Sequence, residues 1–157
     1  MSKIDALSPT LYVLAGPNGI GKTTSFYSLF PVNLPTINAD EIAKQLREQL
    51  GEINVQEIAN GEATRQMNSY ISCRESFGFE TNLADTKTWR FLESLQAIGY
   101  RICINFFSTD DVKLCIERVK NRVKEGGHFV RPDVIIARYE VGLKLLRHYK
   151  ICPMYWF

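Results

Sequence analysis

A glycine-rich segment between an apolar run and a helical pattern constrains this chain more than any other feature. Gly16-Pro-Asn-Gly-Ile-Gly-Lys-Thr23 matches the pattern GxxxxGK[ST] in full. Residues 11–15 before it are typical of a buried strand, and residues 22–30 after it have a helical pattern that Pro31 ends. A strand, a glycine-rich turn and a helix in this order predict a P-loop, in which backbone N–H groups and a helix N-terminus surround an anion.

The residue types of this loop indicate the phosphates of ATP or GTP as its ligand. Lys22 is expected on the loop surface, where it would reach the β and γ phosphates and act in catalysis, and the Thr23 hydroxyl would ligate Mg²⁺. ATP and Mg²⁺ are therefore the expected cofactors. The residues expected to bind the nucleotide are Gly16, Pro17, Asn18, Gly19, Ile20, Gly21, Lys22, Thr23 and Thr24.

Apolar runs alternate with longer helical patterns along the rest of the chain. This alternation predicts an α/β fold of the P-loop NTPase class, with a parallel sheet covered by helices on both faces. The expected strands are 11–15, 36–39, 77–81 and 101–107, and the expected helices are 22–30, 40–50, 55–72, 86–98, about 112–124 and 132–149.

Length and composition limit the classes of protein that this chain can be. Its 157 residues suit one domain, 1–157. The formal net charge of +2 gives no reason to expect nucleic acid or a membrane surface as a partner. We find no signal peptide and no run near the length of a membrane span, so a cytoplasmic protein is expected.

Five segments in a fixed order resemble the zeta toxin family of small P-loop kinases. The P-loop segment is specific alone, and the others are specific only in combination. They are 14–24, 37–42 (Ile-Asn-Ala-Asp-Glu-Ile), 77–83 (Phe-Gly-Phe-Glu-Thr-Asn-Leu), 99–101 (Gly-Tyr-Arg) and 118–130, with arginines at 118 and 122 and Gly-Gly-His at 126–128.

The resemblance implies a nucleotide-kinase-like core with a mobile helical lid. The best-known members are toxins of toxin–antitoxin pairs that phosphorylate the 3′-hydroxyl of UDP-N-acetylglucosamine. The implied partners are thus a small-molecule substrate such as a nucleotide sugar, and an antitoxin protein. The chain departs from the family after residue 149, where members continue into another strand, a turn and a helix; a missing strand would expose a sheet edge.

Two carboxylates are candidates for the chemistry. The resemblance implies that Asp40 accepts the proton of the acceptor hydroxyl, while its residue type and place also suit an N-cap of the helix 40–50. Glu80 is expected at the carboxyl end of a strand, where parallel sheets bind ligands. The family places a glutamate linked to substrate or Mg²⁺ there, although Glu80 is also where the strand would emerge into solvent. Thr81 is a weaker neighbouring candidate for substrate binding.

The basic residues of the 118–138 segment are candidates for the lid. Arg118 and Arg122 are four residues apart and share one helix face. Arginines there would neutralise charge on the transferred phosphoryl group, with Arg122 as the catalytic candidate. Arg118, Arg131 and Arg138 are candidates for substrate binding. The alternative is a solvated basic face.

Three functions remain open from the sequence. The first is a kinase of the zeta toxin type, and the second is a kinase for another small alcohol. The third is a shortened nucleotide-binding protein without catalysis.

Overall fold

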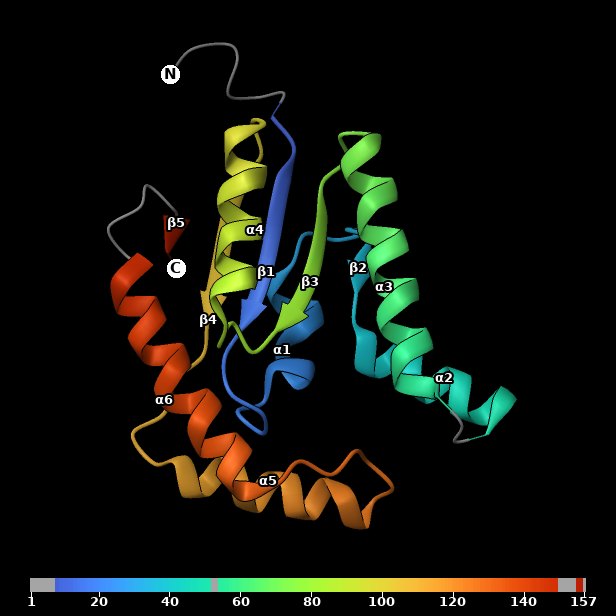
Figure 1. Cartoon of the computed structure of the whole chain (residues 1–157), viewed down its shortest axis with the longest axis vertical. Coiled ribbons are helices and arrows are strands. Elements are labelled where there is room, and N and C mark those ends of the chain that lie inside the picture. The colour runs from blue at the N-terminus through green and yellow to red at the C-terminus, as the bar shows by residue number, and fades with distance from the viewer. Residues whose placement is uncertain (1–7, 52–53, 150–154, 157) are drawn as a thin grey trace.

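The computed structural model describes residues 8–51, 54–149 and 155–156. Strands and helices alternate through this part of the chain, as the sequence predicted (Figure 1). The elements are β1 (Thr10–Ala15), α1 (Lys22–Leu29), β2 (Thr36–Ile37), α2 (Ala39–Leu50), α3 (Val55–Ser72), β3 (Phe77–Thr81), α4 (Thr86–Ala97), β4 (Arg101–Phe106), α5 (Val112–Lys124), α6 (Pro132–Tyr149) and β5 (Tyr155–Trp156).

The strands form one parallel sheet in the order β2-β3-β1-β4-β5. The P-loop strand β1 lies at its centre, paired with β3 on one side and β4 on the other. Leu14 is in register with Glu80 of β3, and Ala15 with Phe106 of β4. The carboxyl ends of these three strands therefore meet at one edge, where the P-loop begins.

Side chains of β1 pack into two separate hydrophobic cores, one on each face of the sheet. Leu11 and Val13 are fully buried in the larger core, which α3, α4 and α6 close. Leu14 points the other way and packs with Phe30, next to α1. In Figure 1, α4 lies in front of the sheet and α1 behind it. Both faces of the sheet are covered, as expected for parallel strands.

The connection between β2 and α2 differs from expectation. The strand expected at 36–39 ends at Ile37, and α2 begins at Ala39 because the Asn38 side chain accepts hydrogen bonds from the backbone N–H groups of Asp40 and Glu41. Asn38 is thus the N-cap. The interpretation of Asp40 as the cap is wrong. Asp40 lies in the first turn of α2, and its carboxylate does not cap the helix.

The sheet edge beyond β4 also differs from expectation. Tyr155–Trp156 forms β5, which pairs in parallel with Cys103 and Ile104 of β4. The expectation that no strand follows the last helix is therefore wrong. Residues 150–154 and 157, on which that expectation also rested, lie outside the described residues.

Helix α5 lies below the carboxyl edge of the sheet, and α6 rises from there along the side of the sheet next to β4 (Figure 1). We call α5 together with the turn 125–131 the lid. The lid packs on α6 through a small core, in which Cys115 and Val119 of α5 and Ile135 of α6 are buried. Within the described ranges, no helix combines the length and the apolar character that crossing a membrane requires.

We predict that Trp89→Ala destabilises the fold strongly. The Trp89 ring is fully buried in the larger core and stacks on Tyr149 of α6 at 4.5 Å between ring centroids, and its indole N–H donates to the Leu83 carbonyl at 3.3 Å. The free energy of unfolding should fall by about 3–5 kcal/mol, the usual cost of removing a buried aromatic ring. Urea denaturation measures this. Phe129→Ala is the control, because the side chain is 55% exposed and its loss should change stability by less than about 0.5 kcal/mol.

Candidate functional site

The P-loop glycines have backbone geometry that other residues rarely adopt. Gly16, Gly19 and Gly21 have φ angles of 138°, 80° and 105°. A Cβ at position 16 would lie 2.5 Å from the Phe107 carbonyl oxygen, and one at position 19 would overlap the Cys115 carbonyl oxygen. These two glycines let the loop contact the β4–α5 connection and α5 itself. Gly21 precedes α1, so the N-terminus of that helix opens towards the loop.

Lys22 is buried rather than exposed on the loop, contrary to expectation. Its side chain is only 6% exposed, and Nζ donates to the carbonyl oxygens of Gly16 and Pro17 at 2.6 and 3.0 Å. It also donates to Asn82 Oδ1 at 3.4 Å. Burial lowers the Lys22 pKa to about 8, although the nearby Glu80 and Asp40 carboxylates oppose the shift. The loop wraps around the ammonium group and takes it out of water.

Glu80 links the P-loop to the start of α2. Its carboxylate lies 3.9 Å from Lys22 Nζ and accepts hydrogen bonds from the Thr23 hydroxyl at 3.3 Å and from the Asn38 amide at 3.2 Å. Burial raises the Glu80 pKa, and Lys22 opposes that shift. This cluster explains why a charge follows the apolar start of β3. The carboxylate has polar partners at the start of α1 and at the N-cap of α2, and of these Lys22 is buried.

The Thr23 hydroxyl and the Glu80 carboxylate fit a magnesium ion. Both are hard oxygen donors on the same side of the P-loop, which is the donor type that Mg²⁺ prefers. No group of three or more His, Cys, Asp or Glu side chains arranged for a metal occurs in the described part of the chain. The pair therefore fits a site where phosphate oxygens and water complete the coordination, as is usual for Mg²⁺.

Two adjoining cavities lie at the carboxyl edge of the sheet. The P-loop cavity, of about 250 Å³, is lined by Asn18, Gly19, Gly21, Lys22, Thr23, Asp40, Glu80, Arg118 and Arg122. The lid–α2 cavity, of about 290 Å³, is lined by Thr23, Asn38, Asp40, Glu41, Lys44, Arg47, Arg122, Glu125, Gly126, Gly127 and His128. Three residues, Thr23, Asp40 and Arg122, line both. A group held in one cavity therefore faces a group held in the other across these side chains.

Three arginines of α5 and α6 contact the site in different ways. Arg118 donates to the Ile20 carbonyl at 3.1 Å, and Arg138 donates to the Asn18 side chain at 2.9 Å, so both hold the P-loop. Arg122 donates to the His128 carbonyl at 3.1 Å, and its Nε is buried without a hydrogen-bond partner. A buried N–H without an acceptor is costly. Arg122 is thus poised to donate to a group placed in either cavity.

The structure does not bring every candidate into the site. The Thr81 hydroxyl accepts a hydrogen bond from the Leu83 N–H in its own turn and lines neither cavity. Arg131 pairs with Asp133 at 2.7 Å on the exposed surface. His128 lines the lid–α2 cavity. Thr24 lies in α1, and its side chain is outside the described part of the structure.

Sequence reasoning gave no role to Asn38 and Asn82, although both hold the charged cluster. Asn38 connects the α2 N-terminus to Glu80, and Asn82 accepts from Lys22. Asn38 lies directly between β2 and α2, and Asn82 directly follows β3. A polar amide at the carboxyl end of a parallel strand was the available signal.

Sequence similarity links this chain to a protein of Haemophilus influenzae. No model of a protein family matches this chain. It is 28% identical over 128 residues to an uncharacterized protein of Haemophilus influenzae, and the match covers 79% of this chain and 88% of that protein.

Solved structures share the arrangement at low sequence identity. The shikimate kinase of Acinetobacter baumannii, solved with shikimate, is 16% identical with a TM-score of 0.50, covering 98% of this chain and 85% of that one. A chain of the PezAT chromosomal toxin–antitoxin system of Streptococcus pneumoniae is 18% identical with a TM-score of 0.67, covering 96% and 67%. The fold is that of a P-loop kinase.

A third similar structure is part of a complex that repairs RNA. A chain of the Pnkp1/Rnl/Hen1 RNA repair complex is 16% identical with a TM-score of 0.69, covering 89% of this chain but only 46% of that one. This chain therefore spans less than half of the repair protein. The three likenesses establish the fold and do not identify an acceptor.

We predict that Gly127→Ala impairs turnover through Arg122. A Cβ at position 127 would lie 2.5 Å from Arg122 Cγ and 2.9 Å from its carbonyl oxygen, so the arginine must move away. Nucleotide turnover should fall about as much as in Arg122→Ala, while ATP affinity changes little, because an arginine that meets the phosphoryl group mainly in the transition state stabilises that state selectively.

The measurement is steady-state kinetics together with calorimetric ATP binding. Gly61→Ala in α3 is the matched control, because no atom lies within 4 Å of the added methyl group. That substitution should leave turnover unchanged and stabilise the helix by about 0.5–1 kcal/mol. Normal turnover in Gly127→Ala or in Arg122→Ala would place Arg122 on a solvated face.

Proposed function

We propose that this protein is an ATP-dependent phosphotransferase that phosphorylates a hydroxyl group of a small molecule. The observation that carries the proposal is the pair of cavities that share Thr23, Asp40 and Arg122. The P-loop cavity has the residue types that hold nucleotide phosphates. The lid–α2 cavity adjoins it and has room for an acceptor, so donor and acceptor would meet at the shared residues. A protein that only bound nucleotide would need no second cavity there.

In this proposal Asp40 is the general base. The exposed carboxylate lies in the first turn of α2 and lines both cavities. It would accept the proton of the acceptor hydroxyl as that oxygen bonds to the γ-phosphorus. The bond from phosphorus to the β–γ bridging oxygen breaks, which gives ADP and a phosphate monoester. Arg122 would donate to the transferred group through its buried, unpartnered Nε.

The remaining residues would position the nucleotide. Lys22 would donate to the β and γ phosphates in place of its present carbonyl partners, and α1 would present its N-terminus to the same anion. Thr23 and Glu80 would hold Mg²⁺, which when bound neutralises charge on the phosphates. Arg118 and Arg138 would keep the P-loop against the lid through Ile20 and Asn18.

The acceptor and the partner belong to the same proposal. The resemblance to zeta toxins makes UDP-N-acetylglucosamine, at its 3′-hydroxyl, the first acceptor to test. The similar chain of the PezAT toxin–antitoxin system supports a search for an antitoxin encoded beside this protein. We propose that this protein itself acts in the cytoplasm. Because another neighbour comes from an RNA repair complex, an oligonucleotide with a 5′-hydroxyl is the necessary comparison.

We predict that Asp40→Asn keeps ATP binding and loses phosphoryl transfer. Asn38 caps α2, so the change at position 40 leaves the cap intact and the fold stable. An amide cannot accept the hydroxyl proton, and transfer should fall by about two to four orders of magnitude. Calorimetry gives the ATP affinity, and mass spectrometry gives transfer to UDP-N-acetylglucosamine and to the oligonucleotide. Full transfer by the variant would remove Asp40 from the mechanism. Transfer by the wild type to the oligonucleotide alone would move the acceptor to nucleic acids.

We also predict that Lys22→Ala abolishes turnover and lowers stability. The substitution would remove the proposed phosphate contact, and it leaves the largely buried Glu80 carboxylate and two loop carbonyls without their cation. Losing one partner of a buried pair costs about 3–5 kcal/mol. Turnover assays and thermal unfolding report the two effects. Unchanged turnover in a folded Lys22→Ala variant would contradict the P-loop assignment.

A further inference from the structure

A third cavity lies beside α2, and the proposed chemistry leaves it unused. This α2–α3 cavity, of about 260 Å³, is lined by Thr23, Thr36, Asn38, Glu41, Ile42, Gln45 and Gln66. The lining residues come from the start of α1, from β2, from α2 with its N-cap and from α3. The cavity shares only Thr23 with the P-loop cavity, so it is separate from the place where the phosphates would bind.

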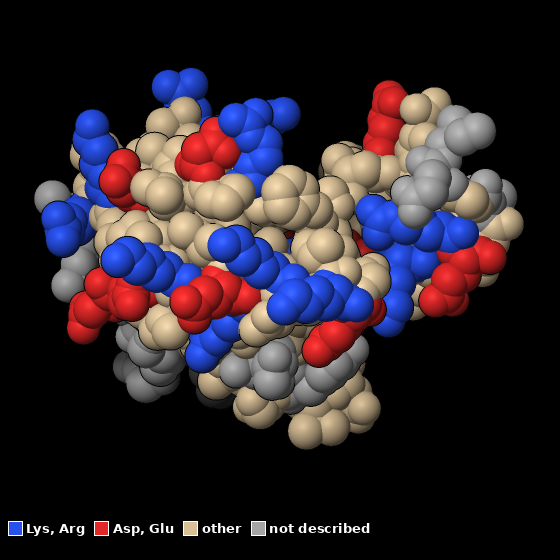
Figure 2. All heavy atoms as spheres, turned by 90° about the horizontal axis from the view of Figure 1, so that it is seen from below, with Lys and Arg blue, Asp and Glu red and all other residues tan. Residues whose placement is uncertain are grey.

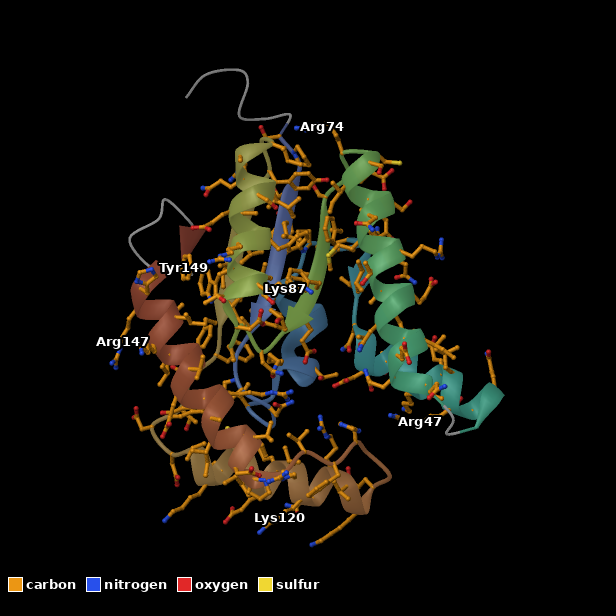
Figure 3. All side chains as sticks on the ribbon, viewed as in Figure 1. Arg47, Arg74, Lys87, Lys120, Arg147 and Tyr149 are labelled. Atoms are coloured by element: carbon orange, nitrogen blue, oxygen red, sulfur yellow. The ribbon has the colours of Figure 1, made fainter. Side chains whose placement is uncertain are left out.

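Helix α2 presents different faces to the two cavities that it lines. Asp40, Lys44 and Arg47 line the lid–α2 cavity, and Arg47 extends from the lower side of the helix in Figure 3. Ile42 and Gln45 line the α2–α3 cavity instead. With about 3.6 residues per turn, the two sets lie on nearly opposite sides of the helix. Side chains of both charge signs gather around the hollow between α2 and the lid (Figure 2), whereas Ile42 and Gln45 are uncharged.

The lining of the α2–α3 cavity offers hydrogen bonds and almost no charge. Among the described residues that line it there is no lysine or arginine. No hydrogen bond within the described part of the chain uses the Thr36 hydroxyl or the Gln45 amide. The Gln66 amide N–H donates to Glu62 at 2.8 Å, which leaves the Gln66 carbonyl oxygen as an acceptor for another group. Donors and acceptors are thus both available to a ligand.

The α2–α3 cavity adjoins the proposed reacting centre at the first turn of α2. Thr23 lines all three cavities, and Asn38 and Glu41 line both the α2–α3 cavity and the lid–α2 cavity. Asp40 lies between Asn38 and Glu41 in the chain. A molecule held in the α2–α3 cavity can therefore extend past these two side chains and place one hydroxyl group at the Asp40 carboxylate.

We propose that the α2–α3 cavity holds an uncharged, hydroxyl-rich part of the acceptor, so that the acceptor presents a neutral sugar or polyol unit to the protein. The inference rests on the proposed kinase function for the role of Asp40. A sugar hydroxyl both donates and accepts, so it matches the Thr36 hydroxyl and both groups of the Gln45 amide. Other hydroxyl groups would donate to the Gln66 carbonyl oxygen and to the Glu41 carboxylate.

The charge of the lining argues against ions as occupants. An anionic group would lose water and meet the Glu41 carboxylate, with no cation beside it among the described lining residues. An ammonium group could pair with Glu41, but this carboxylate is exposed, and exposed ion pairs contribute little. A neutral hydroxyl or amide group loses less hydration on entry and finds an uncharged partner on β2, α2 or α3.

The test compares neutral acceptors with charged counterparts. Glucose, N-acetylglucosamine and myo-inositol are the neutral probes, glucosamine is the cationic probe, and gluconate and glucose 6-phosphate are the anionic ones. The KM of UDP-N-acetylglucosamine, which carries a neutral sugar unit next to its diphosphate, is measured alongside. Ligand-observed NMR gives binding to the protein loaded with a non-hydrolysable ATP analogue, and phosphoryl transfer from ATP gives KM.

The variants remove single hydrogen-bonding groups at nearly constant shape. They are Thr36→Val, which keeps a β-branched residue in β2, and Gln45→Leu on the exposed surface of α2. Gln49→Leu is the matched control, because Gln49 is exposed one turn later on the same helix and lines none of the three cavities. Thermal unfolding and ATP affinity should be unchanged in all three variants.

We expect at least one neutral probe to bind or react better than its charged counterparts. Thr36→Val and Gln45→Leu should each raise its Kd or KM by about 3- to 10-fold, the net contribution of a hydrogen bond between uncharged groups. The same two variants should raise the KM of UDP-N-acetylglucosamine if that compound is the acceptor. Gln49→Leu should match the wild type in every assay.

The outcomes separate this cavity's role from the kinase proposal. Binding of a neutral probe that depends on Thr36 and Gln45, without transfer, would support the cavity as a sugar site and count against the kinase. Transfer with equal KM in the wild type and both variants would overturn the sugar site and leave the kinase standing. Tighter binding of glucosamine or of either anion than of the neutral probes would also overturn it, and so would failure of every neutral probe and of UDP-N-acetylglucosamine to bind the nucleotide-loaded protein.

Discussion

The pairing of β1 between β3 and β4 determines where the chemistry of this protein lies. Because the three strands are parallel, their carboxyl ends come out at one edge. The P-loop leaves β1 there, and Glu80 lies one strand away, in register with Leu14. The β4–α5 connection leaves the same edge and seats Gly16 against Phe107. Residues 16–24, 80–82 and 107–122 are thus neighbours because of strand order alone.

A buried cation and its oxygen partners then fix the arrangement at that edge. Lys22 binds two loop carbonyls and Asn82, and its neighbour Glu80 accepts from Thr23 and Asn38. The cluster joins three segments of the chain: the P-loop with the start of α1, the end of β3, and the N-cap of α2. Such a network constrains the loop, the third strand and the start of α2 at once. The same network removes the ammonium group from water, which lowers its pKa and leaves it ready for a stronger anionic partner.

Much of the fold and part of the candidate site could be predicted from the sequence, because the patterns that indicate them are local. The P-loop motif, the alternation of strands and helices and the placing of Glu80 at a strand end each depend on neighbouring residues. The errors arose where distant contacts decide. Lys22 is buried because the loop folds back on it. Asn38 caps α2 in place of Asp40, and its amide also donates to Glu80 on a distant strand. No periodicity carries that information. The lid–α2 cavity likewise exists only once residues 40–47 and 122–128 face each other.

The tight seating of the P-loop against α5 has a mechanical consequence. Gly19 lies against the Cys115 carbonyl, and Arg118 donates to the Ile20 carbonyl, so the first two turns of α5 are held directly against the loop. The far end of α5 is different, since nothing lies within 4 Å of a side chain added at Gly126. An insertion between Cys115 and Arg118 would separate these contacts from the loop. Added residues at Gly126 would instead reshape the rim of the lid–α2 cavity and, through Gly127, shift Arg122. In the proposed kinase, this turn would therefore control the shape of the acceptor cavity and the position of Arg122, while the contacts of the P-loop with Cys115 and Arg118 stay unchanged.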